Sequence, residues 1–188
     1  MPELPKTLWT IGHSTLTLEA FISLLRAHQI ETLADVRLLP GSRRFPHFNS
    51  EELAASLSEA GIEYKHFRDL GGRRKPRSDS PNKAWRNESF RGYADYMETT
   101  DFQRAAEELT TCAARKRTAV MCAEAVWWQC HRALISDWLK VRGVKVMHIL
   151  SENKVEPHPF TSAATVTDGQ LSYRAPRAGA TTAELPLT

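Results

Sequence analysis

Residues 118–139 read TAVMCAEAVWWQCHRALISDWL, and they decide the fold because they join a predicted strand to a predicted helix. The strand is Thr118–Cys122, a short apolar run. The helix is indicated by apolar residues at the spacing of one helical face, and Gly143 is expected to end it; these residues are Leu134, Ile135, Trp138 and Leu139. Between strand and helix lie two thiols, a carboxylate, an imidazole and a guanidinium. We therefore predict a polar functional site at this junction.

The same alternation of strand and helix continues in both directions. Further strands are predicted at residues 8–11, 32–36, 62–67 and 144–150, and further helices at 18–25, 49–60, 90–97 and 101–115. Asn49 with Glu52, and Thr100 with Gln103, have the spacing of helix-capping pairs. Strands that alternate with helices favour a parallel sheet with helices on both faces.

We predict one α/β domain over residues 1–188, with three layers and a mainly parallel five-stranded sheet. Its core is expected in about residues 8–150, and residues 151–188 are expected to form a C-terminal loop or hairpin extension. The dipeptide Asp168-Gly169 indicates a hairpin turn within that extension.

The composition is that of an ordinary globular protein, with 41% hydrophobic and 25% charged residues in a chain of 188. No apolar run approaches the roughly 20 residues needed to span a bilayer. The first residues do not have the pattern of a secretory signal. Three cysteines, Cys112, Cys122 and Cys130, are too few and too unevenly spaced for a disulfide framework. We expect a cytoplasmic protein with reduced thiols, and the sequence does not indicate its oligomeric state.

The charge is unevenly distributed. The formal net charge is +3, yet residues 65–91 hold nine Lys or Arg against three acids. This basic segment suggests an anionic ligand or a nucleic acid as partner, although a solvated loop is an equally acceptable interpretation. Residues 71–91 carry most of the excess and are predicted to be a long irregular stretch, which is usually functional or disordered.

The predicted parallel sheet brings distant motifs together. Gly12-His13-Ser14 follows the first strand, Asp35 and Arg37 end the second, and Cys122 and Glu124 end the fourth. Ligands of such folds gather at the carboxyl edge of the strands, so we expect these motifs to share one rim.

Cys130 is the candidate nucleophile. If the last long helix begins near Gln129, Cys130 lies in its first turn, where free N–H groups and the helix dipole favour a thiolate. His131 or His13 is the candidate base, and Glu124 could orient the imidazole. Cys130 could equally be a small buried apolar residue, or a zinc or redox ligand with Cys122. Cofactors are therefore unknown, with zinc as a minor possibility.

The other candidates are expected to bind substrate. Arg37 and Arg132 can hold negative charge, and Asp35 is either their orienting partner or half of a structural ion pair. The remaining candidates are hydroxyls, a thiol and a cation, namely Ser14, Ser42, Arg43 and Cys122. Trp127 and Trp128 could wall a substrate pocket or cap the core, and core packing is the commoner role of Trp.

Taken in order, these motifs resemble a family, the bacterial and archaeal domain of unknown function 488. The matching pieces run from residue 8 to about 150; they are Thr10–Ser14, Asp35–Arg37, Ser42-Arg43 with Phe45, Leu70–Gly72, Phe90 with Tyr93, Tyr96 and Met97, Met121–Glu124, Cys130–Arg132 and His148-Ile149. The resemblance implies a compact α/β domain and supports the choice of site residues. It implies no reaction.

Our leading hypothesis is an enzyme, a Cys/His-dependent transferase or hydrolase, acting on an anionic substrate that is nucleotide-like or derived from nucleic acid. A second hypothesis is a non-catalytic nucleic-acid-binding module that uses residues 65–91. A third is a metal or redox protein built on Cys122 and Cys130. No membrane partner is expected.

Overall fold

The computed structural model describes residues 4–175 and contains one main sheet. Its five parallel strands are β1 (Thr7–Gly12), β2 (Thr32–Asp35), β3 (Glu63–His66), β4 (Thr118–Cys122) and β5 (Lys145–Ser151). A sixth strand, β6 (Lys154–Pro157), pairs antiparallel with β5 at the edge, so that the order is β3-β2-β4-β1-β5-β6. The mainly parallel sheet is confirmed. The expected number of strands was one too low, because β6 is four residues long and has no fully buried side chain to mark it.

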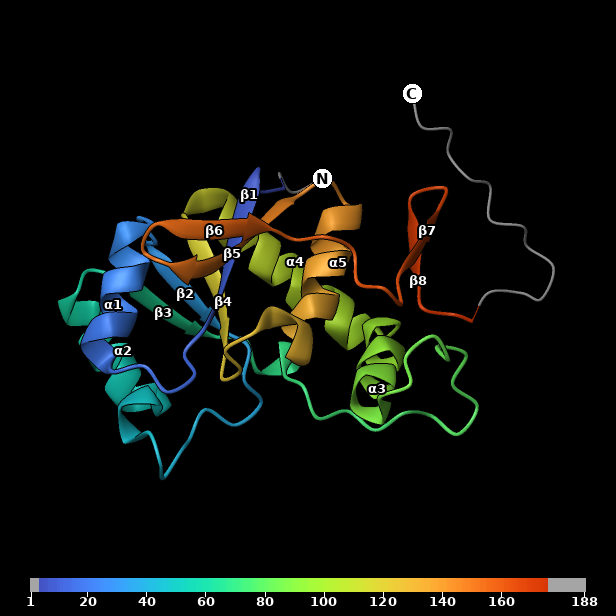
Figure 1. The fold of residues 1–188 in the computed structure, drawn as a ribbon, viewed down its shortest axis with the longest axis horizontal. Coiled ribbons are helices and arrows are strands. Elements are labelled where there is room, and N and C mark those ends of the chain that lie inside the picture. The colour runs from blue at the N-terminus through green and yellow to red at the C-terminus, as the bar shows by residue number, and fades with distance from the viewer. Residues whose placement is uncertain (1–3, 176–188) are drawn as a thin grey trace.

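Helices cover both faces of the sheet (Figure 1). On one face lie α1 (Leu18–Ala27) and α2 (Ser50–Glu59), which pack their buried side chains on Leu33, Ala119 and Met121. On the other lie α3 (Glu88–Met97), α4 (Thr100–Arg115) and α5 (Arg132–Val141), which pack on Ala34, Val120 and Cys122. Successive strand residues point to opposite faces, so each strand contributes to two separate cores.

Three helix starts differ in detail from the prediction. Asn49 does precede α2, but its side-chain oxygen accepts from the Ser42 amide at 2.6 Å and caps nothing. The cap of α4 is Thr99 instead of Thr100, and its hydroxyl accepts from the Phe102 amide at 3.3 Å. The last long helix begins at Arg132, three residues later than predicted. The intervening residues Trp127–Gln129 form a 3₁₀ turn instead.

The register of the sheet aligns the motif-bearing strand ends. Gly12 of β1 lies opposite Cys122 of β4, and Asp35 of β2 lies opposite Met121. The chain leaves β1 and β2 toward the α1/α2 face, whereas it leaves β4 toward the α5 face. Loops that depart to opposite sides of neighbouring strands open a crevice between them, which is where α/β sheets bind ligands.

The C-terminal extension contains the predicted hairpin. Strands β7 (Thr165–Thr167) and β8 (Gln170–Ser172) pair antiparallel around Asp168 and Gly169, whose φ angles are 49° and 74°. Positive φ at both central residues is the geometry that an Asp-Gly turn favours. The part of the extension beyond residue 175 lies outside the described residues.

A buried carboxylate attaches this extension to α5. Asp137 is fully buried and accepts four hydrogen bonds: from Nε2 of His158 at 2.9 Å, from the amide and hydroxyl of Thr161 at 3.0 and 2.6 Å, and from the hydroxyl of Tyr173 at 2.9 Å. Four donors compensate the desolvation of one negative charge. The sequence did not mark Asp137, because its partners follow it by 21 to 36 residues.

The network continues through two further side chains into the sheet. His158 lies 2.9 Å from Nε2 of His148, and Nδ1 of His148 lies 2.6 Å from the hydroxyl of Thr10. Trp127 stacks on His148 with ring centroids 4.6 Å apart. Burial next to His158 lowers the pKa of His148 to about 3, so this imidazole is neutral at physiological pH. Trp127 therefore serves the core.

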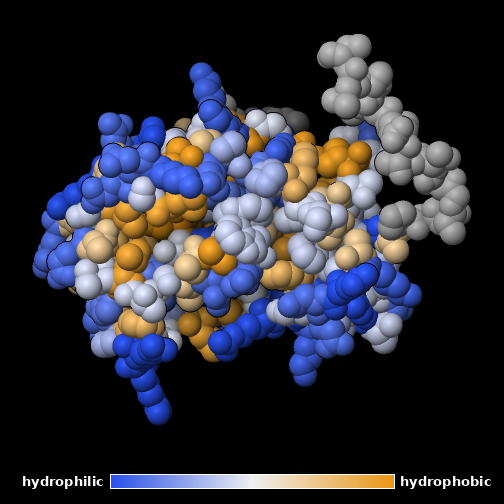
Figure 2. All heavy atoms as spheres, viewed as in Figure 1, coloured by the Kyte–Doolittle hydropathy of each residue, from blue (hydrophilic) through white to orange (hydrophobic). Residues whose placement is uncertain are grey.

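The surface is mixed in polarity. On the face shown in Figure 2, apolar residues gather where α1 lies, and hydrophilic side chains surround them. Within residues 4–175, no helix has both the length and the apolar character needed to cross a bilayer.

The Asp137 network predicts a large loss of stability on truncation. Replacing Asp137 by Ala leaves the donors of His158, Thr161 and Tyr173 buried without an acceptor, which should reduce the free energy of unfolding by about 3–5 kcal/mol. Urea denaturation measures this change. The control Glu108→Ala removes an exposed carboxylate of α4 and should cost no more than about 0.5 kcal/mol. Equal losses in both variants would show that the network does not stabilise the fold.

Candidate active site

A cavity of about 690 Å³ lies at the carboxyl edge, between the loops that follow β1, β2 and β4. Eight of the eleven residues predicted for the site line it: His13, Ser14, Arg37, Ser42, Cys122, Glu124, Cys130 and His131. The other three, Asp35, Arg43 and Arg132, do not. The tertiary structure therefore brings most of the predicted residues to one hollow, as the strand order requires.

The two thiols of this cavity are in contact. Sγ of Cys130 lies 2.7 Å from Sγ of Cys122, and both cysteines are free and buried. The thiol of Cys130 donates toward Cys122, while the Arg132 amide donates to Cys130 at 3.4 Å. Cys130 precedes α5 by two residues, so its sulfur receives an N–H group of the first turn without belonging to the helix. Two sulfurs this close share one proton readily.

His131 faces the same thiol pair. Its Nε2–H donates to the carbonyl oxygen of Val36 at 3.0 Å, which leaves Nδ1 free to accept, and Nδ1 lies 3.5 Å from Sγ of Cys130. Burial lowers the pKa of His131 to about 4, so the ring is neutral and can accept a proton. Gly72 packs against this ring; a Cβ there would lie 2.8 Å from Nδ1. A backbone carbonyl, and not the predicted Glu124, thus orients the imidazole.

The guanidinium of Arg132 lies beneath the loop that follows β4. Nη2 donates to the carbonyl oxygens of Glu124 and Ala125 at 3.0 and 2.9 Å. Nε and Nη1 are buried and have no hydrogen-bond partner among the described residues. Arg132 is only 2% exposed and forms no ion pair within residues 4–175. Its charge therefore acts on its surroundings without a carboxylate to offset it.

This electrostatic environment shifts the pKa values of the two thiols in opposite directions. Burial opposes ionisation of Cys122, but the hydrogen bond from Cys130 and the charge of Arg132 outweigh it and lower the pKa of Cys122 below its usual value. Burial and the neighbouring Cys122 raise the pKa of Cys130. The hydrogen bond from Cys130 and the charge of Arg132 therefore favour the thiolate at Cys122.

The opposite wall is fixed by an ion pair. Arg37 and the fully buried Asp35 meet at 2.6 Å, and Tyr64 donates a further hydrogen bond to this carboxylate at 2.7 Å. Arg37 also donates to Nε2 of His13 at 3.3 Å, while Nδ1–H of His13 donates to the Ser14 carbonyl at 3.0 Å. Burial and the charge of Arg37 lower the pKa of His13 to about 4. Both ring nitrogens of His13 are occupied, so it is a weaker candidate for the base than His131.

Backbone contacts close the site between β1 and β4. The amides of His13 and Ser14 donate to the carbonyls of Cys122 and Ala123, each at 3.0 Å. A Cβ at Gly12 would lie 1.8 Å from the Glu124 carbonyl oxygen, so only glycine allows the loop to cross the end of β1. The glycine of the predicted Gly12-His13-Ser14 motif is therefore explained by a close approach of two chain segments.

The remaining predicted residues have peripheral positions. The side chain of Glu124 is exposed and forms no hydrogen bond or ion pair within residues 4–175. Ser42 accepts from the Phe45 amide at 3.1 Å and shapes the rim. Arg43 is exposed and does not line the cavity, whereas its neighbour Arg44 does. Trp128 is 53% exposed and belongs neither to the core nor to the cavity wall.

Sequence reasoning missed four kinds of lining residue. They are the cations Arg44 and Arg73, the aromatic Phe90, the glycine Gly72 and the hydroxyl Thr15. All of them except Thr15 lie in or beside motifs that stand out in the sequence by their charge or by the family resemblance. Their residue types could therefore be recognised from the sequence. Their direction toward the cavity could not, because it depends on how α3 packs and on the path of the irregular segment that holds Gly72 and Arg73.

Metal binding finds no support in this arrangement. Within residues 4–175, no group of three or more His, Cys, Asp or Glu side chains could hold a metal ion. His13 is tied to Arg37, and His131 directs only one nitrogen to the thiols.

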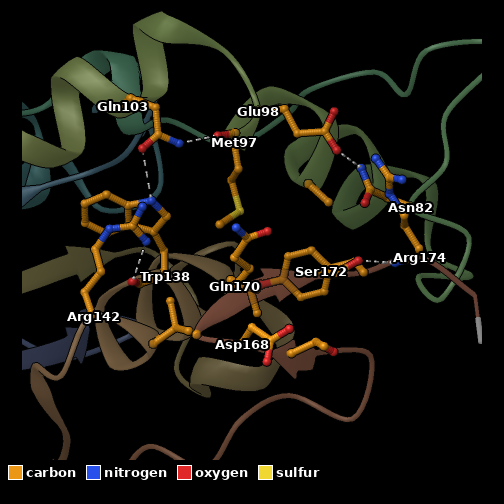
Figure 3. A pocket seen from close by; sticks show the side chains of 16 residues that line it. Asn82, Met97, Glu98, Gln103, Trp138, Arg142, Asp168, Gln170, Ser172 and Arg174 are labelled. Carbon is orange, nitrogen blue, oxygen red and sulfur yellow. Dashed lines mark hydrogen bonds between the residues drawn. The ribbon is translucent and has the colours of Figure 1, made fainter.

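A second cavity, of about 850 Å³, lies between the β7–β8 hairpin, α3 and α5 (Figure 3). Arg142 stacks over the Trp138 ring at 3.7 Å, and Trp138 donates to Gln103 at 3.3 Å. Asn82 donates to Glu98 at 3.1 Å on the other side. This cavity is larger than the first, but none of the predicted site residues lines it, and it holds no thiol or imidazole. The chemistry of the chain is concentrated in the first cavity.

Comparison with known proteins agrees with the resemblance noted in the sequence. The sequence model of the family described as "Domain of unknown function DUF488" matches residues 17–139, and the chain belongs to this family. No curated protein and no solved structure matches the chain significantly.

The lowered pKa of His131 predicts a pH-dependent stability. His131 is neutral in the folded protein down to about pH 4, whereas in the unfolded chain it binds a proton below about 6.5. Its contribution is therefore present above about pH 6.5 and is lost as the pH falls toward 4. When the pH falls from 7 to 4.5, the free energy of unfolding should decrease in both proteins. The decrease should be about 2 kcal/mol smaller in His131→Gln than in the wild type.

Urea denaturation across this pH range measures the difference. Gln129→Ala, a change at an exposed neighbour that does not titrate, serves as the control and should follow the wild type. If His131→Gln shows the wild-type slope, the imidazole is not held neutral by burial.

Proposed function

We propose that this member of the DUF488 family is an enzyme that attacks an anionic substrate with a cysteine thiolate at the carboxyl edge of the sheet. The observation that carries the proposal is the contact between Cys122 and Cys130 beside the buried guanidinium of Arg132, which forms no ion pair within residues 4–175. The proposal assigns the nucleophile to Cys122, with Cys130 as its hydrogen-bond donor. The sequence had favoured Cys130.

The argument begins with the cost of burying Arg132. A cation removed from water without a partner costs several kcal/mol, and proteins normally offset it with a carboxylate. No such carboxylate pairs with Arg132 in the described part of the chain. The charge of Arg132 acts on both thiols and helps to lower the pKa of Cys122. A thiolate at Cys122 supplies the missing counter-charge.

His131 completes the set of reacting groups. Its neutral Nδ1 can accept the proton of Cys130, and the Val36 carbonyl fixes the tautomer that makes this possible. A thiolate, a proton acceptor and a group that orients this acceptor are the parts of nucleophilic catalysis. Attack by Cys122 forms a bond between sulfur and the substrate, and the leaving group departs with its electron pair and takes the proton. Transfer of the bound group to water or to a second substrate then regenerates the thiolate.

The cavity walls favour an anionic substrate with a flat ring. Arg44 and Arg73 are exposed, line the cavity and form no ion pair within residues 4–175. Phe45 and Phe90 line the same hollow and offer apolar ring faces. Cations beside aromatic rings suit the phosphate and base of a nucleotide. Thiolate chemistry also requires a reducing compartment, which agrees with a location in the cytoplasm.

A non-catalytic nucleic-acid-binding module is less well supported. Within the basic segment 65–91, Lys65 pairs with Glu63 and Arg77 pairs with Glu98. Arg74 stacks on Tyr96 at 3.7 Å, and Arg91 donates to the Trp85 carbonyl at 3.1 Å. Arg74, Arg77 and Arg91 thus hold the irregular segment together, and Lys65 is paired within β3, so fewer cations are free for phosphates than the sequence suggested.

The thiolate is tested by alkylation with iodoacetamide, followed over pH and mapped by mass spectrometry. Cys122 should react with a midpoint below the pH of about 8.5 that an ordinary thiol needs. Arg132→Met should slow alkylation of Cys122 at pH 7 about tenfold, whereas Arg132→Lys, which keeps the charge, should slow it less. Arg115→Met, at the exposed end of α4, is the control and should change nothing.

Circular dichroism confirms that each variant is folded. The proposal is rejected if Cys122 in the folded wild type reacts no faster than Cys112. It is also rejected if the folded Arg132→Met protein keeps the wild-type rate.

Binding of an anionic substrate is tested by the protection of Cys122 against alkylation. Adenosine monophosphate at millimolar concentration should slow alkylation of Cys122, because it occupies the cavity that leads to the sulfur. The double variant Arg44→Ala/Arg73→Ala should abolish this protection while the alkylation rate without nucleotide stays unchanged. Adenosine, which lacks the phosphate, should protect at least tenfold less well. Equal protection by both compounds would show that the site does not select an anion.

A further inference from the structure

We propose that Cys122 and Cys130 also act as a two-electron redox pair that reduces a small peroxide and closes as a disulfide. This inference rests on the thiolate of the proposed function, but it requires no anionic substrate. It starts from a feature that nucleophilic attack alone does not need. A single thiolate suffices for attack, whereas this cavity holds a second sulfur 2.7 Å from the first.

The loop geometry presents both sulfurs together. The Cys122 carbonyl accepts from the His13 amide, and Arg132 holds the carbonyls of Glu124 and Ala125. These bonds fix the start of the segment that separates the cysteines, and the 3₁₀ turn Trp127–Gln129 fixes its end. The two sulfurs must approach by only about 0.7 Å to reach the bonding distance of a disulfide.

The charges favour reaction at Cys122 first. Cys122 accepts the hydrogen bond from Cys130 and lies in the field of Arg132, so it is the sulfur that attacks a peroxide, since the thiolate is the reactive form. Both cysteines line the cavity, yet they are only 2% and 4% exposed. A molecule the size of hydrogen peroxide can reach a sulfur so enclosed, whereas a bulky protein disulfide is excluded.

The chemistry is balanced in two steps. The Cys122 thiolate attacks one peroxide oxygen and breaks the O–O bond, which gives a sulfenic acid at Cys122 and a hydroxide that takes up a proton to become water. The Cys130 thiol then passes its proton to Nδ1 of His131 and attacks the Cys122 sulfur, which forms the disulfide and releases a second water. Two thiols lose two electrons and one peroxide gains them. A small external dithiol restores the reduced pair.

The third cysteine provides an internal control. Cys112 lies in α4, and its sulfur is 3.7 Å from Nζ of Lys65, on a part of the chain that does not line the cavity. It has no second sulfur beside it among the described residues. Peroxide should therefore leave Cys112 as a free thiol under conditions that oxidise the pair.

The test titrates the reduced full-length protein with hydrogen peroxide and counts thiols after denaturation. One equivalent should remove two of the three thiols, and dithiothreitol should restore both. Trypsin releases residues 118–132 as one peptide that carries both cysteines, and this peptide should become about 2 Da lighter and resist alkylation. Cleavage after Glu124 then splits it into two halves that stay joined until reduction.

Single substitutions show which cysteine attacks the peroxide and which one closes the disulfide. Cys130→Ser should trap the sulfenic acid at Cys122, detected as a dimedone adduct, and Cys122→Ser should leave Cys130 at least tenfold less reactive. Cys112→Ser should behave like the wild type. The inference is overturned if peroxide oxidises Cys112 as fast as the pair, or if Cys122 is oxidised without forming a bond to Cys130.

The alkylation result separates this inference from the proposed function. Rapid alkylation of Cys122 without disulfide formation removes the redox inference and leaves the nucleophile intact. If Cys122 is inert to both reagents in the folded protein, both proposals fail.

Discussion

The guanidinium of Arg132 is the group on which the rest of the site depends. It lies under the loop after β4 and donates to two of the carbonyls of that loop, while its buried Nε and Nη1 have no hydrogen-bond partner among residues 4–175. The contacts fix the path of the chain between the two cysteines. The unbalanced charge makes it favourable for one of the thiols to ionise. One side chain thus supplies both the geometry and the electrostatics of the thiol pair.

The other wall of the cavity is rigid for a different reason. The ion pair of Asp35 and Arg37 is buried at the end of β2, where it is costly to break because either partner alone would remain charged in a nonpolar environment. Arg37 in turn holds the imidazole of His13. Burial keeps both His13 and His131 neutral, but only His131 directs a free nitrogen toward a sulfur. The two histidines look equivalent in the sequence, and hydrogen bonding distinguishes them.

Local patterns predicted much of the fold. The run Thr118–Cys122 and the apolar face of α5 were readable because strand and helix periodicities are short-range properties. The Asp-Gly turn of the β7–β8 hairpin was readable because few dipeptides tolerate two positive φ angles. The strand β6 and the true cap of α4 were missed, since edge pairing and a cap shifted by one residue leave almost no signal in the sequence.

The sequence by itself determined which residue types carry the chemistry and, through the alternation of strand and helix, that they meet at one edge of a parallel sheet. Only the tertiary structure decided how they are paired there. In the structure, Cys122 contacts Cys130, and the Val36 carbonyl accepts a hydrogen bond from His131. Arg43 does not line the cavity, and the side chain of Glu124 is exposed. The physical reason is that residue type and periodicity depend on neighbours along the chain. Hydrogen bonds, burial and the charge on a thiol depend on neighbours in space, and these come from segments up to 138 residues apart.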